Sequence, residues 1–493
     1  MTEFTAAQRR AIEETGKTLL VSAAAGSGKT TTLIERILHS VCGKEKPVPV
    51  DRLLVVTFTR AAAGELRARI SRALSRALEE NSGDAFLQRQ ISLLPSAKIS
   101  TIDSYCLELV RANFAALGLS PAFRVTDEGE ARLIARRTME ALIGDCCDNP
   151  ESTICGGAAG FAKLPELLLG AGSDERAADL FLSLYEKLES DPRGAAALLD
   201  CARDLSDFAK TDFFSTPPGK RIEQALGSMF DHYRAAYRLA LEKIHADRRL
   251  EKAYSEAYEA DYAGILHIAE ALKSGFAAAG EAIQNTEFKK LGAYRRTDEL
   301  PDGFDFVRTL RQEYKEDLKD ARAAYFSASP EAVNECLLAT AGVCRGAAEL
   351  LLEYEKRAAE EKRRRNVCDF SDISRYALSL LVDENGQDTP LAMEQKAAFD
   401  AVYIDEYQDV NAVQDRIFRA ISTERNRFMV GDIKQSIYAF RGAEPSIFAG
   451  MRKTYPALDA AAESSYATLY MRENFRCSAP VIDFTNQIFD CLM

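Results

Sequence analysis

The chain has 493 residues, of which 47% are hydrophobic and 28% are charged, and its formal net charge is −12 at pH 7. This length allows two to four domains, and the composition is that of an ordinary globular protein, which excludes a disordered or fibrous chain. No apolar run approaches the length of a membrane-spanning helix and no secretory signal is visible, so we expect a cytoplasmic protein. The negative charge argues against a uniformly basic coat for nucleic acid, although a local basic channel remains possible.

Cysteines and histidines give no sign of a metal site. The 11 cysteines are scattered without a Cys-x-x-Cys pair, and the 4 histidines are isolated in the sequence. Zinc sites need closely spaced ligands of these two types, so we expect reduced and mostly buried thiols instead.

The first 115 residues alternate apolar strands with helical patterns, which is typical of a parallel sheet with flanking helices. From about residue 120 to 385, Ala, Leu, Glu, Arg and Lys recur at helical spacing, which predicts a large, mainly helical inserted domain. Strand signals then return, so we expect the sheet to be completed after the insert. The expected strands are 19–22, 53–57, 98–101, 401–404 and 427–430, and the expected early helices are 30–41, 61–79 and 104–114.

Residues 23–30, Ala-Ala-Ala-Gly-Ser-Gly-Lys-Thr, follow an apolar strand and predict a phosphate-binding loop. Glycines let backbone N–H groups turn toward the phosphates, and the following helix N-terminus attracts an anion. Lys29 can reach the β- and γ-phosphates of a nucleoside triphosphate, and the Thr30 hydroxyl can bind Mg²⁺. The usual pattern has Gly where this chain has Ala23, and the alternative is a glycine-rich turn that binds nothing. The residues expected to hold the nucleotide are Ala23, Ala24, Ala25, Gly26, Ser27, Gly28, Lys29, Thr30 and Thr31.

An apolar strand that ends in acids runs from Val402 to Asp409. In a nucleoside triphosphatase this strand lies close to the phosphate-loop strand, because metal binding and general-base work need adjacent carboxylates at one sheet edge. Asp405 is then expected to reach Mg²⁺, and Glu406 to orient and deprotonate the attacking water. The alternative is a solvated acidic turn.

A third strand, loop and helix pattern covers residues 429–443. Gln435 can contact a γ-phosphate or the attacking water, as Gln does in other phosphate-loop enzymes. Tyr438, Phe440 and Arg441 offer flat faces on which nucleic-acid bases can stack. The alternative places Ile437, Tyr438 and Phe440 in the core, and we expect at least one of them to be buried.

Segments from the start of the chain nearly to its end resemble, in order, the motifs of UvrD/Rep-type superfamily 1A DNA helicases. The resemblance implies two RecA-like domains with ATP and Mg²⁺ between them, Gln8 as the adenine reader, and Arg476 as an arginine finger. It also implies single-stranded DNA contacts at Thr57, Phe58, Thr59, Thr101, Ser104, Tyr438, Phe440 and Arg441. The matching segments are Phe4–Gln8 (Q motif), Ala23–Thr30 (I), Thr57–Ala63 (Ia), Thr101–Cys106 (Ib), Asp405–Asp409 (II), Gly431–Ala443 (III) and Glu473–Arg476 (IV).

Within that group the sequence most resembles the AddA family, the helicase–nuclease subunits of bacterial AddAB complexes. The likeness is carried by Gly431–Tyr438, Ala443–Pro445 and Asp369–Ile373, and by the long insert. It implies an ATP-dependent helicase or translocase that processes double-strand breaks for recombinational repair, with single-stranded and duplex-end DNA as ligands and an AddB-like partner subunit. Asp103 stands where the family usually has His. Motifs V and VI and the nuclease motif are not found, so we expect an N-terminal fragment without the nuclease.

The resemblance divides the chain into a first RecA-like domain (1–115 and 386–462), a helical insert (116–385) and the start of a second RecA-like domain (463–493). Three alternatives remain open. They are a UvrD-type repair helicase without a nuclease, a RecB-like subunit, and a fragment that binds nucleotide and DNA with no activity of its own. The long insert favours the helicase–nuclease subunit over the first alternative.

Two charged features have ordinary structural explanations. The basic run Lys362–Arg365 could contact duplex DNA, but a solvated face balanced by Glu355, Glu360 and Glu361 is the favoured interpretation. Asp369 and Asp372 are expected to cap a helix that starts near Ser371, and not to bind a metal.

Overall fold

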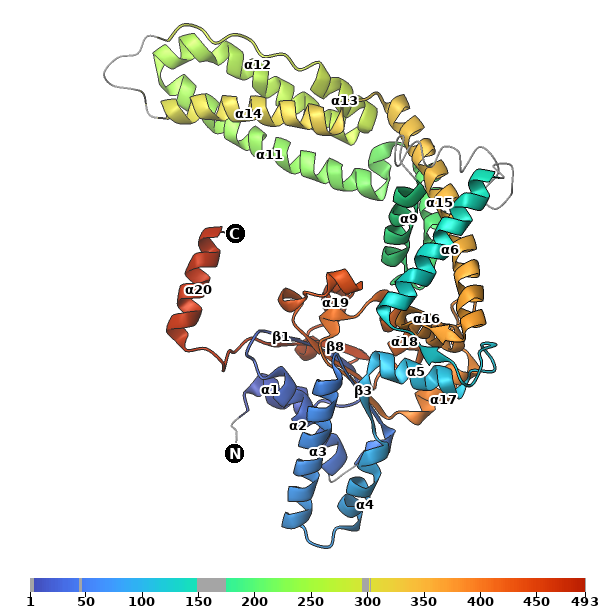
Figure 1. Ribbon diagram of the computed structural model, residues 1–493. Coiled ribbons are helices and arrows are strands. Elements are labelled where there is room, and N and C mark those ends of the chain that lie inside the picture. The colour runs from blue at the N-terminus through green and yellow to red at the C-terminus, as the bar shows by residue number, and fades with distance from the viewer. Residues whose placement is uncertain (1–3, 44–46, 149–173, 295–300, 302, 493) are drawn as a thin grey trace. The chain divides into compact units, whose positions relative to one another are not determined.

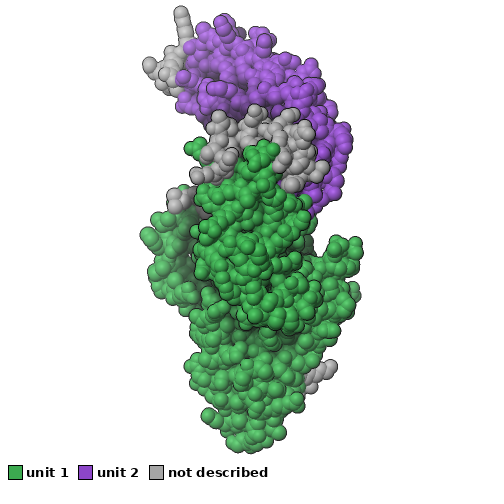
Figure 2. All heavy atoms as spheres, turned by 45° about the vertical axis from the view of Figure 1, so that its right-hand side comes forward, with its two compact units in different colours: residues 1–148, 172–195, 351–493 green, residues 149–171, 196–350 purple. Residues whose placement is uncertain are grey.

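The computed structural model describes residues 4–43, 47–148, 174–294, 301 and 303–492. The chain divides into two compact units, which Figure 2 colours separately. The sheet unit comprises residues 1–148, 172–195 and 351–493, and the helical unit comprises residues 149–171 and 196–350. Among the described helices, none has the length and apolar character that a membrane span requires.

The sheet unit is built on a six-stranded, wholly parallel sheet in the order β3-β2-β6-β7-β1-β8 (Figure 1). The strands are apolar runs buried on both faces, which is the pattern of a sheet covered by helices on each side. All the strands expected from the sequence are confirmed, with ends that differ by at most one residue. Their bounds are β1 Thr18–Ala23, β2 Leu53–Thr57, β3 Lys98–Thr101, β6 Ala401–Ile404, β7 Arg427–Gly431 and β8 Tyr466–Met471.

Helices cover both faces of this sheet, so the unit has a hydrophobic core on each side. One core contains α1 (Ala6–Glu13), α2 (Lys29–Cys42), α3 (Arg60–Glu80) and α4 (Ala85–Leu93). The other contains α5 (Ile102–Ala112), α16 (Phe370–Leu381), α17 (Pro390–Ala398), α18 (Ala412–Ala420) and α19 (Pro445–Thr454). The α/β class expected from the sequence is therefore confirmed, whereas α4 was not expected.

Strand β8 corrects one expected domain boundary. The division at residue 463 assigned this segment to a second domain, but β8 pairs with β1 from Thr18↔Tyr466 to Ala23↔Met471. Ala467, Leu469 and Met471 are buried in the same core as α1 and α2, and burial of these side chains favours the pairing. Helix α20 (Ala479–Leu492) follows β8.

The expected limits of the insert, residues 116 and 385, also differ from the observed units. Helices α6 (Glu128–Asp148) and α9 (Asp174–Leu188) group with the sheet unit, as do residues 351–365 of α15 (Pro330–Arg365). The sheet unit also contains a short parallel pair, β4 (Arg124–Val125) with β5 (Val367–Cys368). The part that separates as its own unit is therefore smaller than the expected insert.

The helical unit confirms that the middle of the chain is mainly helical. Its core is rich in buried aromatic side chains such as Phe230, Tyr237, Tyr258 and Tyr314. A buried ion pair joins α14 to α12, with 2.6 Å between Arg311 Nε and Asp261 Oδ2. Within the described part of the unit, the α-helices besides the start of α15 are α10 Ala197–Phe208, α11 Pro217–Ala246, α12 Arg248–Lys273, α13 Phe276–Gln284 and α14 Phe304–Tyr325.

Candidate functional site

The predicted phosphate loop lies between β1 and α2, at the carboxyl edge of the sheet. Gly26 and Gly28 have φ of 72° and 80°, in the left-handed region that side chains other than glycine rarely adopt. A Cβ on Gly28 would lie 2.9 Å from Gln8 Nε2, and one on Gly26 would lie 2.5 Å from Asn474 Oδ1. The loop is therefore a backbone cradle with no room for side chains at these positions. Lys29, Thr30 and Thr31 follow it in the first turn of α2.

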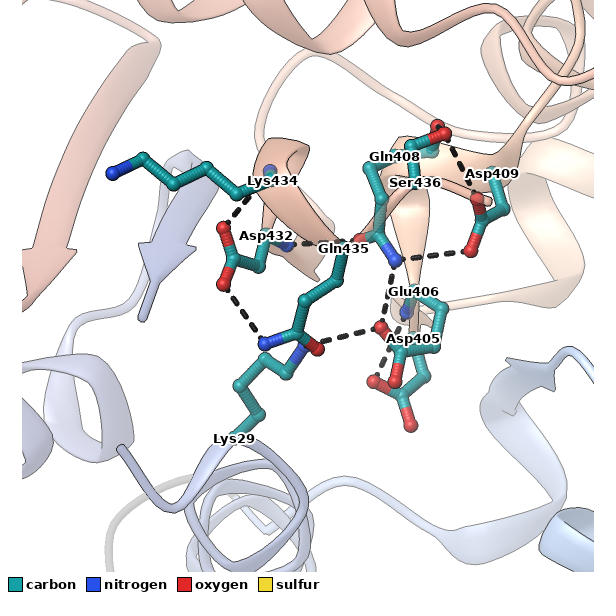
Figure 3. Close-up of polar contacts among 9 residues, drawn as sticks. All are labelled: Lys29, Asp405, Glu406, Gln408, Asp409, Asp432, Lys434, Gln435 and Ser436. Carbon is teal, nitrogen blue, oxygen red and sulfur yellow. Dashed lines mark hydrogen bonds and ion pairs between the residues drawn. The ribbon is translucent and has the colours of Figure 1, made fainter. Parts of the chain in front are cut away.

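Lys29 is the residue that joins the three predicted chemical segments. Its side chain is 11% exposed, and Nζ lies 3.2 Å from Glu406 Oε2 and 3.0 Å from Gln435 Oε1 (Figure 3). The positive charge of a nearly buried ammonium needs oxygen partners, and here they come from the segments after β6 and β7. The structure thus brings together Lys29, Glu406 and Gln435, which are far apart in the sequence.

The two carboxylates after β6 differ in environment. Asp405 is held by its backbone N–H, which donates to Val56 O at 3.0 Å, and its Oδ1 accepts from the N–H of Glu406 at 3.0 Å. Burial, and then the negative charge of Glu406, raise the pKa of Asp405 to about 6, although the nearby Lys29 ammonium acts to lower it. A bound cation would offset this raised pKa, because a positive charge stabilises the carboxylate form.

Glu406 has a strained backbone. Its φ of 50° and ψ of 45° place a residue other than glycine in the left-handed region, at a cost of about 1–2 kcal/mol. Such a conformation persists only where the surroundings fix it, and these positions cluster at functional sites. The conformation points the side chain toward Lys29 and Gln408 (Figure 3).

Gln408 and Asp432 complete the polar network and were not singled out from the sequence. Gln408 Nε2 donates to Glu406 Oε2 at 2.9 Å and to Asp409 Oδ2 at 3.0 Å, while its Oε1 accepts from the N–H of Asp432 at 2.9 Å. Gln435 Nε2 donates to Asp432 Oδ2 at 2.9 Å. Asp432 directly follows β7, and Gln408 lies in the short turn after β6; the carboxyl ends of both strands share an edge with β1, a signal that would have identified these residues.

A cavity of about 390 Å³ opens beside this network. Its lining includes Thr30, Asp405 and Glu406 together with Phe58 and Tyr438. The rings of Phe58 and Tyr438 are stacked, with 4.3 Å between their centroids. The predicted metal and catalytic groups therefore share one cavity with an aromatic pair from the predicted DNA-binding segments.

The other predicted DNA-binding residues divide into exposed and structural ones. Phe440 is 78% exposed. Thr57 Oγ1 donates to Thr59 O, and the hydroxyls of Thr59 and Thr101 cap α3 and α5, where Thr101 also contacts Ser104. The side chain of Arg441 lies outside the described structure.

The expectation that at least one of Ile437, Tyr438 and Phe440 is buried was wrong. Ile437 is 69% exposed, and Tyr438 is half-buried. Tyr438 stacks on Phe58 at the cavity instead of joining either hydrophobic core of the sheet unit.

Gln8 and Arg476 approach the phosphate loop from two sides. Gln8 is buried and forms a capping box with Thr5, and its Nε2 donates to Ser27 O at 3.0 Å. On the other side, the N–H of Phe475 donates to Gly26 O at 2.9 Å, while the side chain of Arg476 is exposed. Asp103 lies in the first turn of α5, where the helix dipole favours a negative charge.

Contrary to the expectation, the basic run Lys362–Arg365 is not solvated throughout. Asp369 and Asp372 form a capping box on α16, as predicted. Lys362, however, is not solvated, because its side chain is 13% exposed and Nζ lies 2.6 Å from Asp369 Oδ2 and 2.9 Å from Asp372 Oδ1. The ion pairs with these two carboxylates stabilise the lysine in its buried position. Around Lys362, Arg364 and Arg365 pair with Glu361, and Glu355 pairs with Arg375.

Comparison with known proteins agrees with this geometry. A protein-family model described as UvrD/REP helicase N-terminal domain matches residues 4–456. The chain is 31% identical to the A-type subunit of the ATP-dependent helicase/nuclease of Clostridioides difficile strain 630, over 100% of this chain and 39% of the relative. It is 35% identical to the corresponding protein from Thermoanaerobacter sp. strain X514, over 100% of this chain and 40% of the relative. For the corresponding protein from Geobacillus kaustophilus the identity is 34%, over 99% of this chain and 39% of the relative.

The chain thus spans about two fifths of the length of these curated relatives. With the family model matched over most of its length, the chain belongs to the UvrD/REP helicase family.

Proposed function

We propose that the chain binds and hydrolyses ATP and uses the energy to move along single-stranded DNA. The observation that carries the proposal is the position of Lys29, whose ammonium lies within hydrogen-bond distance of both Glu406 and Gln435. In phosphate-loop enzymes the γ-phosphate lies where such a lysine, a general base and a neutral polar side chain converge. In this proposal residues 23–31 hold the phosphates, and Gln8 contacts the adenine.

The residues at the sheet edge fit a magnesium ion. Mg²⁺ is bound through one or two protein oxygens together with phosphate oxygens and water, so it needs no cluster of acids. Among the described residues there is no group of three or more His, Cys, Asp or Glu that could hold a metal. Thr30 and Asp405 line the same cavity and would hold the ion. When bound, it supplies positive charge that stabilises the transferring phosphoryl group.

Side chains of the protein then have separate roles in hydrolysis. The Glu406 carboxylate accepts a proton from the attacking water, and Gln435 orients that water or senses the γ-phosphate. Lys29 exchanges its carboxylate and amide partners for phosphate oxygens, because the several negative charges of a triphosphate attract the ammonium. We also propose that Arg476 faces the γ-phosphate, since its segment already contacts the phosphate loop through Phe475.

Single-stranded DNA is proposed to bind across Phe58, Tyr438 and Phe440. Base stacking on aromatic rings is tolerant of sequence, which suits a motor that must pass over every base. The remaining members of this set are the loop residues Thr57, Thr59, Thr101, Ser104 and Arg441.

The names of the relatives extend the proposal to the whole protein. We infer that it acts as the AddA-like subunit of a cytoplasmic helicase–nuclease, which processes duplex DNA ends with an AddB-like partner in recombinational repair. The large helical unit favours this over a UvrD-type repair helicase without a nuclease.

The substitution Glu406→Gln tests the proposal. It keeps the shape and hydrogen bonding of the side chain but removes the base, so the ATP hydrolysis rate is expected to fall about 100- to 10,000-fold. Binding of a nonhydrolysable ATP analogue is expected to stay within about twofold, since the substitution leaves the phosphate loop unchanged. Glu384→Gln, in an exposed turn of the same unit, is the matched control. Full turnover by the Glu406→Gln protein would refute the assignment.

A further inference from the structure

We propose that Gln408 is a positioning residue that ties the hydrolytic carboxylate Glu406 to the loop carrying Tyr438, so that contact with DNA controls the rate of ATP hydrolysis. The inference rests on the proposed function, because it gives Glu406 and Tyr438 the roles assigned there. Gln408 lines the same cavity but is only 1% exposed, so we assign it the positioning of Glu406 and not contact with substrate.

The amide of Gln408 is fully used. It is 1% exposed, and both of its N–H groups and its oxygen make hydrogen bonds, to Glu406, Asp409 and the backbone of Asp432. The backbone of β7 lies close against this side chain, since a Cβ added to Gly431 would overlap Gln408 Oε1. A buried amide with every donor and acceptor engaged has one orientation, because any rotation leaves polar groups unpaired.

The network around this amide is a closed circuit, which can be followed in Figure 3. Lys29 contacts Glu406, Glu406 accepts from Gln408, and Gln408 accepts from the backbone of Asp432. The side chain of Asp432 then accepts from Gln435, whose oxygen accepts from Lys29. When phosphate oxygens draw Lys29 out of the circuit, Gln408 still holds Glu406 Oε2 in place. The general base therefore keeps its position at the moment when it is needed.

The same amide connects to the DNA side of the cavity. Asp432 also accepts from the N–H of Lys434 and so caps the turn Ile433–Gln435, three residues before Tyr438. In addition, Ser436 Oγ donates to Asp409 Oδ1 at 3.1 Å, and Asp409 accepts from Gln408. A base that stacks on Tyr438 and displaces its loop would thus move Asp409 and Asp432, two of the three partners of Gln408, and through Gln408 it would move Glu406.

The chemistry of this position requires an amide. A glutamate here would have the same shape but only acceptors, and it would face the carboxylates of Glu406 and Asp409 at hydrogen-bond distance. A methionine would fill the space but leave Glu406, Asp409 and the N–H of Asp432 without their partner. These two substitutions separate the shape of the side chain from its hydrogen bonds.

The test compares Gln408→Met and Gln408→Glu with the wild type, in the protein as its gene encodes it. Gln90→Met is the matched control, because Gln90 is also buried and accepts from a backbone N–H, that of Val50, far from the site. The measurements are thermal unfolding, affinity for a nonhydrolysable ATP analogue and for a single-stranded oligonucleotide, and kcat and KM for ATP with and without that oligonucleotide.

For both Gln408 variants we expect kcat to fall about 10- to 100-fold, the effect of one lost hydrogen bond to a charged group. Stimulation by the oligonucleotide should fall to within about twofold of the basal rate, while KM and both affinities stay within about twofold. Loss of stimulation with intact DNA affinity is the result that a merely structural residue would not give.

Wild-type kcat and stimulation in Gln408→Met would overturn the inference. So would failure of both variants to fold, or a parallel decline of kcat and both affinities matching that of Gln90→Met. If Glu406→Gln turns over fully, the proposed function itself fails. If Glu406→Gln is inactive and Gln408→Met behaves as the wild type, only the role of Gln408 fails.

Discussion

Replacing Lys362 by Met should destabilise the sheet unit strongly, although the residue belongs to a basic run that the sequence suggests is solvated. Its ammonium is the shared partner of Asp369 and Asp372, and all three side chains are at most 20% exposed. Lys362 holds the pKa of Asp369 below its usual value despite the opposing effect of burial. Burial, and then the charge of Asp369, raise the pKa of Asp372 to about 6. Without the lysine, two carboxylates would remain buried side by side.

Removing one partner of a buried ion pair costs about 3–5 kcal/mol. We expect about 3 kcal/mol at pH 8, the lower end, because these side chains border a cavity of about 760 Å³ that admits water. In the variant the folded-state pKa of both carboxyls lies above the unfolded value, so the folded state binds more protons and its stability falls as pH rises. Lowering the pH from 8 to 5 should therefore restore about 1–2 kcal/mol.

The assay is native-state hydrogen exchange of the amides of α16, measured at pH 5 and pH 8, which reports the free energy of opening of that helix. Lys356→Met is the control, since Lys356 lies on the same helix as Lys362 but is 66% exposed and pairs with Glu353 at 3.9 Å. The control should change stability by less than about 0.5 kcal/mol. The reasoning is refuted if Lys362→Met matches the control at pH 8, or if its loss of stability does not depend on pH.

Three further predictions concern the same unit. Burial raises the pKa of Glu189 to about 7 from its ordinary 4.5, so ionisation of this carboxyl destabilises the fold as pH rises through this interval. Glu189→Gln should therefore be more stable than the wild type by up to about 3 kcal/mol at pH 8 and equally stable at pH 4. Urea unfolding at the two pH values measures this difference. Gly431→Ala should displace the Gln408 amide, costing about 1–3 kcal/mol of stability and abolishing DNA-stimulated ATP hydrolysis; unchanged stimulation would contradict this. Phe58→Ala removes the ring stacked on Tyr438 and should weaken single-stranded DNA binding about 5- to 100-fold in an oligonucleotide titration, and an unchanged affinity would argue against base stacking at this pair.

Features that depend on local patterns were predictable from the sequence. The strands are short apolar runs bounded by turn residues, and both glycines of the phosphate loop occupy positions that require a left-handed backbone. The cap of α16 by Asp369 and Asp372 was likewise predictable, because capping uses side chains three residues apart.

Features that depend on contacts between separate elements were not predicted. The pairing of β8 with β1 joins residues more than 400 positions apart, and the buried position of Lys362 follows from two carboxylates beyond the end of its own helix. Gln408 falls within a predicted segment, but its role depends on the N–H of Asp432 in another strand's loop. Sequence periodicity reports which side of an element is buried, and it carries no information on the identity of a distant partner.

The position of β8 has a practical consequence for anyone who shortens this protein. Without Tyr466–Met471, the backbone of β1 would present a row of unpaired N–H and C=O groups along six apolar or small residues. An open strand edge of this kind is a template for pairing with another molecule, and it leads to self-association or aggregation. A version of the chain cut before residue 466 should therefore be poorly soluble even though it keeps the phosphate loop, Glu406 and Gln435, whereas a version that retains β8 keeps that edge closed.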